Sequence, residues 1–150
     1  MTRDSAPPEL FRPLRPASIP ATGYRVEITA NPEERSKLAR RFNLPSVEDL
    51  SCSFTLTREP GAAIHASGVL SARVTQICRV TLAPFPASIE EHFTVRFVPE
   101  GCEAAPFDLE APDEIPYSGG TLDLGEVAAE QLALALDPWP RKPGATLQVH

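Results

Sequence analysis

The chain has 150 residues, of which 42% are hydrophobic and 23% charged, and its formal net charge is -6. This length suits one domain with a substantial hydrophobic core and leaves little room for a second core. No apolar run approaches the ~20 residues of a membrane helix, and the first ten positions are too rich in acidic residues and proline for a secretory leader. We therefore expect a cytoplasmic protein without a membrane partner.

The charges are unevenly distributed along the chain. Residues 1–60 carry nine Lys and Arg against eight Asp and Glu, whereas residues 61–150 carry five against twelve. Between Glu90 and Asp137 the only base is Arg96, so this stretch repels a phosphate backbone wherever it is exposed. A general DNA-binding protein is excluded, and any contact with nucleic acid must come from local basic residues.

The first third of the chain predicts an arm, a strand and a helix. Residues 1–22 carry five prolines and no sustained periodicity, which indicates an extended or partly disordered arm. Residues 24–29 alternate apolar and charged side chains, as a half-buried strand does. Asn31 and Glu34 stand where a capping box begins a helix, and we expect that helix to end near Phe42.

The rest of the chain predicts three further strands and a second helix. Apolar residues alternate over residues 50–57, 64–74 and 89–97, with a bulge or bend at Gly68 and a break at residues 84–86. Residues 100–120 are acidic, rich in Pro and Gly, and predicted to be a long loop. Asp123 and Glu126 then resemble a second capping box, and the helix that follows ends before Pro138.

The order of these elements is typical of an α+β domain. We expect a bent antiparallel sheet, partly barrel-like, of about four or more strands with two main helices. The domain is predicted to span residues 23–138, with the arm of residues 1–22 before it and an extended tail of residues 139–150 after it.

No local signature of a catalytic or metal site is found in the sequence. A zinc site would require Cys52, Cys78, His92 and Cys102 to converge, and there is no C-x-x-C pair. A Cys78–His92 dyad is conceivable across the hairpin, although no third residue is seen to orient it. We predict no catalytic residues, no metal and no cofactor.

Two motifs carry a resemblance to a known family. Residues 76–85 read QICRVTLAPF, and residues 122–138, after a strand and an acidic segment, read LDLGEVAAEQLALALDP. Together, with the Pro/Arg arm, they resemble the YceD family over roughly residues 8 to 145. These are small bacterial and plastid proteins linked to accumulation of the large ribosomal RNA.

The sequence departs from this family at the cysteines. Many relatives carry a C-x-x-C-L pattern in the hairpin and further cysteines after the last helix. Here Cys78 matches the first cysteine, Thr81 stands at the second, and residues 137–145 contain no cysteine. The resemblance therefore does not imply a metal site in this chain.

The resemblance implies a non-enzymatic ribosome-biogenesis factor. It would support accumulation or maturation of large-subunit (23S) rRNA by binding that RNA or a pre-ribosomal particle. An alternative is an adaptor that binds basic ribosomal or assembly proteins through its acidic loop, without direct RNA contact. A third is a small thiol-dependent enzyme that uses Cys78.

Two sets of residues are predicted to carry the implied role. The hypothetical contact face for RNA or a partner comprises Arg40, Arg41, Arg73, Arg79, Arg141 and Lys142. Arg40 and Arg41 have a second interpretation, because cations in the last turn of a helix oppose its dipole. The expected structural residues, which hold the hairpin to the last helix or bound that helix, are Cys78, Leu82, Phe85, Asp123, Leu124, Glu126, Leu132, Leu136 and Pro138.

Overall fold

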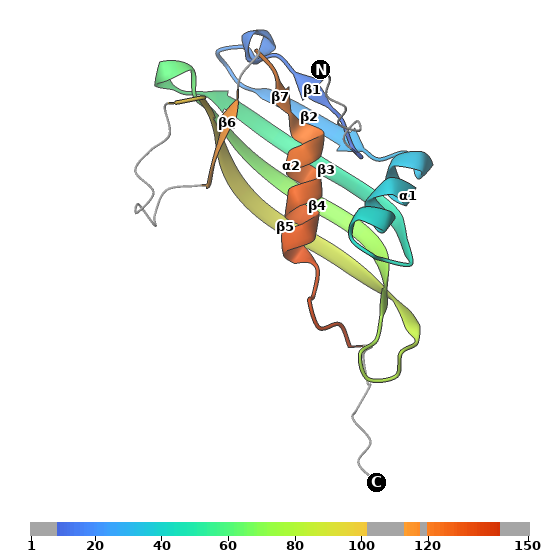
Figure 1. Ribbon diagram of the computed structural model, residues 1–150. Helices are drawn as coiled ribbons and strands as arrows, with labels where there is room; N and C mark the ends of the chain where they lie inside the picture. Colours follow the sequence, from blue (N-terminus) through green and yellow to red (C-terminus); the bar gives the residue numbers. More distant parts are fainter. Residues whose placement is uncertain (1–8, 102–112, 118–119, 142–150) are drawn as a thin grey trace, which may run out of the picture.

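The computed structural model describes residues 9–101, 113–117 and 120–141, and it shows a curved sheet with two helices on one face (Figure 1). The main sheet has five strands in the order β2-β3-β4-β5-β6. Their bounds are β2 Tyr24–Thr29, β3 Ser46–Arg58, β4 Ile64–Ile77, β5 Pro84–Pro99 and β6 Asp113–Tyr117. The remaining elements are β1 Pro13–Leu14, η1 Pro16–Ser18, α1 Pro32–Arg41, η2 Pro60–Ala62, β7 Leu122–Asp123 and α2 Leu124–Ala135.

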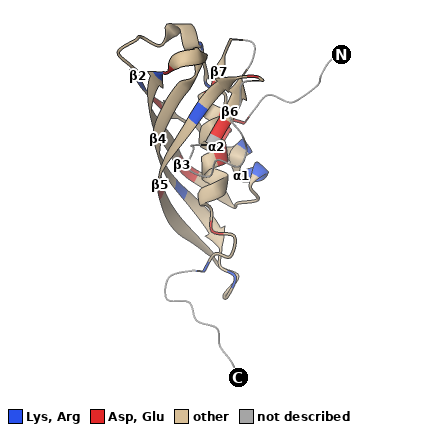
Figure 2. Ribbon diagram, turned by 90° about the vertical axis from the view of Figure 1, so that its left-hand side faces the viewer, with Lys and Arg blue, Asp and Glu red and all other residues tan. Residues whose placement is uncertain are grey.

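The predicted strands form an antiparallel sheet with one parallel addition. β2, β3, β4 and β5 pair antiparallel in sequence order, as expected, and the fold class α+β is confirmed. The described strands do not close into a barrel, because β2 and β6 form the two ends of the sheet. The sheet nevertheless curves around α2 (Figure 2).

Two expectations about the strands are wrong. The predicted loop of residues 100–120 contains β6, which pairs parallel to β5. The acidic and proline residues of β6 have low strand propensity, so its pairing depends on the neighbouring strand rather than on a local pattern. Residues 84–86 are not a break either: they begin β5 and pair with residues 75–77 of β4, and the turn lies at residues 78–83.

Alternation along the strands separates the two faces of the sheet. α1 packs on β3 and α2 on β4 and β5, over side chains that include Leu50, Cys52, Leu70 and Phe97, each at most 1% exposed. The residues between them, such as Ser53, Ser67 and His92, lie on the opposite face, which no described helix covers (Figure 2). This uncovered side is called the open face below.

Gly68 is required by a close contact rather than by a bulge. Strand pairing is continuous through Gly68, which lies opposite Phe54 on β3 and Phe93 on β5. A Cβ atom at this position would lie 2.3 Å from the ring of Phe93, which itself packs edge-to-face on Phe54. The register shift in the sheet occurs instead between Val47 and Asp49.

The two helix starts follow the capping prediction to different extents. At α1, Asn31 accepts from the amide of Glu34, and the Glu34 carboxylate accepts from the amide of Asn31, so the capping box is complete. At α2, Asp123 accepts from the amides of Gly125 and Glu126. The carboxylate of Glu126 forms an ion pair with Arg41 instead of accepting from the backbone amide of Asp123. Asp123 is therefore an N-cap without the reciprocal half of a capping box.

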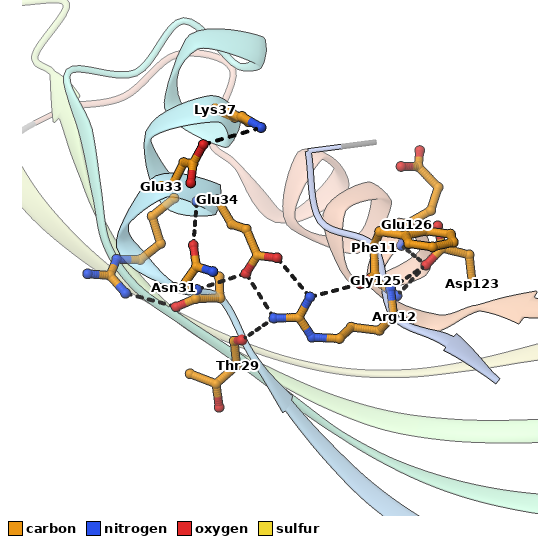
Figure 3. Close-up of polar contacts among 12 residues, drawn as sticks. Phe11, Arg12, Thr29, Asn31, Glu33, Glu34, Lys37, Asp123, Gly125 and Glu126 are labelled. Atoms are coloured by element: carbon orange, nitrogen blue, oxygen red, sulfur yellow. Dashed lines mark hydrogen bonds and ion pairs between the residues drawn. The ribbon is translucent and has the colours of Figure 1, made fainter. Parts of the chain in front are cut away.

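The described part of the N-terminal segment lies against the start of α2 (Figure 3). β1 pairs with β7, Leu10 is 1% exposed, and the amide of Arg12 donates to Asp123 at 2.9 Å. Gly125 makes this approach possible, since a Cβ atom there would lie 2.3 Å from the carbonyl oxygen of Leu10. Within the described ranges, neither helix is long and apolar enough to cross a membrane.

Candidate functional site

The turn between β4 and β5 is organised around Cys78. The Cys78 amide donates to the carbonyl of Ala83 at 2.9 Å, and the amide of Leu82 donates to the carbonyl of Cys78 at 2.8 Å. The Cys78 sulfur accepts from the amides of Val80 and Thr81, at 3.3 and 3.4 Å. These hydrogen bonds fix the backbone of the turn. The Cys78 side chain is fully buried, and the next residue, Arg79, is exposed.

The segment after α2 returns to this turn (Figure 1). The amide of Arg79 donates to the carbonyl of Pro140 at 2.8 Å, and the Arg79 guanidinium lies 4.6 Å from the centroid of the Trp139 ring. The Trp139 amide is held by the carboxylate of Asp137 at 2.9 Å. A cation stacked on an aromatic ring is thereby fixed at the end of the molecule, with the indole 64% exposed.

A cleft lies beside this cation–aromatic pair. It has a volume of about 450 Å³ and separates the end of α1 from the hairpin and the end of α2. Most of the residues that line the cleft are apolar, among them Phe42, Leu44, Ile77, Leu82 and Leu136. Arg79 also lines the cleft. One polar residue that lines the cleft is buried: Gln76, which is 7% exposed.

The structure does not bring the predicted contact residues onto one face. Arg79 lies at the hairpin turn, and Arg141 follows Trp139 by two positions, so these two share the lower end of the molecule, where Figure 2 shows basic positions. Arg73 is exposed on the open face, opposite Asp49. Lys142 lies outside the described residues.

Arg40 and Arg41 have different surroundings. Arg40 is exposed in the last turn of α1, just before the residues of the cleft. Arg41 forms ion pairs with Glu9 at 3.0 Å and Glu126 at 3.1 Å, and the hydrogen bond that Arg41 donates to Glu126 raises the pKa of Arg41. Arg41 thus joins α1 to the start of α2, and Glu126 serves this ion pair rather than the predicted capping box.

Most of the predicted structural residues are part of the core. Phe85, Leu124 and Leu132 are at most 6% exposed, and Leu136 is half-buried against the core. Leu82 is an exception, because its side chain is 73% exposed and cannot hold the hairpin to α2. The physical reason is local: Leu82 closes the turn with a positive φ of 63°, beyond the last pair of strand residues. Pro138 is also exposed and lies at the cleft.

The thiols are poorly placed for nucleophilic catalysis. Burial raises the pKa of the Cys52 thiol to about 12, so this thiol stays protonated near neutral pH. His92 pairs with Val69 in the middle of the sheet, roughly 26 Å of strand away from Ile77 beside Cys78. The Cys78–His92 dyad is therefore not assembled. Among the described residues, no three His, Cys, Asp or Glu side chains are grouped to hold a metal ion, and Cys102 lies outside them.

A second hollow lies on the open face. It has a volume of about 740 Å³ and is lined mainly by polar residues, including Arg25, Ser53, Ser67 and His92. No cation–aromatic contact occurs among its described lining residues, in contrast to the cleft at the hairpin. We therefore take the cleft and the hairpin turn as the candidate site.

Comparison with known proteins identifies the family of the chain. Neither the curated proteins nor the solved structures include a match. The family described as "Large ribosomal RNA subunit accumulation protein YceD" matches residues 66–149, more than half of the sequence, including β4, β5, α2 and the Arg79–Trp139 pair. The protein belongs to the YceD family, whose name connects it to accumulation of the large ribosomal RNA.

Proposed function

We propose that this protein is a non-enzymatic factor that binds large-subunit rRNA, free or in a pre-ribosomal particle, and so supports its accumulation. The family name supports the general role in rRNA accumulation. The binding surface that we propose is the hairpin-tip surface, defined as Arg79, Leu82, Trp139 and Arg141. We expect the protein to act in the cytoplasm, where its RNA partner is assembled.

The observation that carries this proposal is the exposed stack of Arg79 on Trp139. Proteins that bind single-stranded RNA combine cations, which neutralise phosphates, with aromatic rings, on which bases stack. The chain as a whole is acidic, so its RNA contact must be confined to a local basic surface. Within the described residues, the Arg79 guanidinium forms no ion pair with a carboxylate and is available for phosphate.

The proposal is tested by crosslinking and sequencing of RNA bound to the tagged protein in its native cells. The test variant carries Arg79→Glu and Arg141→Glu, and the control carries Arg25→Glu and Arg73→Glu on the open face. Both variants change the net charge equally, and thermal unfolding of each purified chain verifies that it is folded. We expect discrete sites in large-subunit rRNA with the unmodified protein and the control, and their loss in the test variant.

Two results would contradict the proposal in different ways. Equal loss in both variants would mean that overall charge, rather than the hairpin-tip surface, governs binding. Recovery of ribosomal or assembly proteins without rRNA would favour the adaptor function instead. The acidic segment on which that alternative depends, residues 100–120, contains β6, and its residues 102–112 and 118–119 lie outside the described residues.

A further inference from the structure

The cleft beside the hairpin has the size and lining of a small-ligand site. Pockets for such ligands are largely apolar, occupy on the order of 300–1,000 Å³ and contain a few placed polar groups. The cleft, at about 450 Å³, has Leu44, Ile77 and Leu136 among its apolar residues and is formed by three separate elements. Its polar features are Gln76 within and Arg79 at its side.

Packing of the hydrophobic core does not explain why a glutamine is buried at position 76. Its side chain is 7% exposed and is the one polar residue among the buried residues of the described structure. Within the described residues, the side-chain amide of Gln76 makes a single hydrogen bond, from Nε2 to the carbonyl of Asp137 at 3.4 Å. A side-chain amide has two N–H donors and an acceptor oxygen, so most of the capacity of Gln76 is unused at a position that lines a cleft.

The surroundings of Gln76 indicate the chemistry of the missing partner. A nucleobase has apolar faces that fit walls such as Ile77 and Leu136, and an edge with adjacent donors and acceptors that fits a glutamine amide. A phosphate beside the base would meet Arg79. The Asp137 carboxylate, the acidic group that lines the cleft, is engaged by the Trp139 amide.

We propose that the cleft holds one unpaired base of single-stranded RNA. Gln76 hydrogen-bonds the edge of this base, Arg79 contacts the adjoining phosphate, and the exposed indole of Trp139 stacks on a neighbouring base. This inference rests on the proposed function and makes it more specific, since it requires unpaired RNA rather than a duplex. The apolar walls alone would also accept a peptide side chain, but the cation and the unused amide favour RNA.

Trp139 provides a direct probe, because it is the single tryptophan of the chain. The full-length protein is titrated with a single-stranded oligoadenylate of about eight nucleotides, a length typical of one binding module. Indole fluorescence reports stacking, and anisotropy of the labelled RNA reports binding independently. The same oligoadenylate paired with its complement serves as the duplex probe. The test variant is Gln76→Leu, and the matched control is Gln131→Leu on α2, away from the cleft.

We expect the single strand to bind and to quench Trp139 fluorescence, and the duplex to bind at least about tenfold more weakly. Gln76→Leu should weaken binding about tenfold, because a site built to hydrogen-bond a base loses affinity without that bond. Gln131→Leu should leave affinity unchanged. Trp139→Ala, followed by anisotropy, should weaken binding at least fivefold, roughly the lower limit for one base–aromatic stack.

The outcomes separate this inference from the proposed function. Binding of the single strand without quenching, or with full affinity in Gln76→Leu, would overturn the base pocket while RNA binding stands. Equal binding of duplex and single strand would also overturn it. No binding of either RNA, for a chain verified as folded, would overturn the pocket. The proposed function would fall as well only if the unmodified protein also gave no rRNA sites in the cellular crosslinking experiment.

Discussion

The side chain of Arg12 joins three parts of the described chain: the N-terminal segment, the end of β2 and the start of α1. Its guanidinium donates to both carboxylate oxygens of Glu34 at 2.8 Å and to the carbonyl of Thr29 at 2.7 Å (Figure 3). The hydrogen bond from Arg12, together with the backbone amide of Asn31, lowers the pKa of Glu34 from its ordinary value of 4.5 against the opposing effect of burial. The same carboxylate therefore caps α1 and fixes the N-terminal segment.

This lowered pKa makes a pH-dependent contribution to stability. Because the folded state holds the proton of Glu34 less tightly than the unfolded state, the contribution is complete above the unfolded pKa and is lost as pH falls through the folded pKa. Glu34→Gln keeps a side chain suited to the capping box and removes the charge. We expect it to reduce the free energy of unfolding by about 1 kcal/mol at neutral pH.

The difference between the two proteins should shrink progressively as the pH falls below the ordinary pKa of 4.5, which urea unfolding at several pH values would measure. Glu33→Gln, on the exposed side of the same turn, is the control and should show little effect. An equal loss for Glu34→Gln at acidic and neutral pH would mean that the charge of Glu34 is not the source of its contribution.

At the scale of elements, α2 stabilises the fold through one side of the helix. Leu124, Val127, Ala128 and Leu132 are buried, whereas Leu134 is 74% exposed. Leu132→Ala should reduce the free energy of unfolding by about 2–5 kcal/mol, because it removes a fully buried leucine and leaves a cavity. Leu134→Ala makes the same chemical change and should stay within about 0.5 kcal/mol of the unchanged protein. Similar denaturant midpoints for the two variants would refute this packing.

The sequence predicts those elements whose signals are local. Asn31 and Glu34 define α1 because the capping box is formed within four residues, and the alternation from Leu50 to Leu56 defines β3. β6 escapes prediction because its short, acidic segment acquires strand structure from β5, which no local pattern reports. The long-range contact between Glu126 and Arg41 is missed for the same reason.

The candidate site was predicted only in part. The sequence predicts Arg79 and Arg141 as contact residues, but the stacking of Arg79 on Trp139 depends on the return of the chain after α2. The predicted contact face also includes Arg73, although strand alternation directs Arg73 to the open face. The sequence does not predict a role for Gln76, since burial of a polar residue near the end of a strand has no sequence signal.

At the scale of the whole molecule, the N-terminal segment contributes to the core. The division at residue 23 into arm and domain stays a proposal, yet Leu10 is 1% exposed and contacts the start of α2 through its backbone. Leu10→Ala should therefore reduce the free energy of unfolding by about 2–5 kcal/mol. Phe11→Ala, at a neighbouring residue that is 52% exposed, is the matched control and should change it much less.

Chemical denaturation of both variants distinguishes a docked segment from an arm that adds nothing to stability. If Leu10→Ala unfolded at the same denaturant concentration as Phe11→Ala, the N-terminal segment would be an arm that adds nothing to stability.

The contact between Arg12 and Asp123 also has a consequence for the order of synthesis. The two residues are separated by 111 positions, and the Leu124 amide in turn donates to the carbonyl of Arg12. During translation, β3, β4 and β5 each leave the ribosome with a partner already made, since each pairs with the strand before it. Residues 10–14, by contrast, contact Thr29 and Glu34 early but lack their partners at the start of α2 until residue 125 has been added. The contacts that join residues 10–14 to the start of α2 therefore form late, after β2 to β5 have been made.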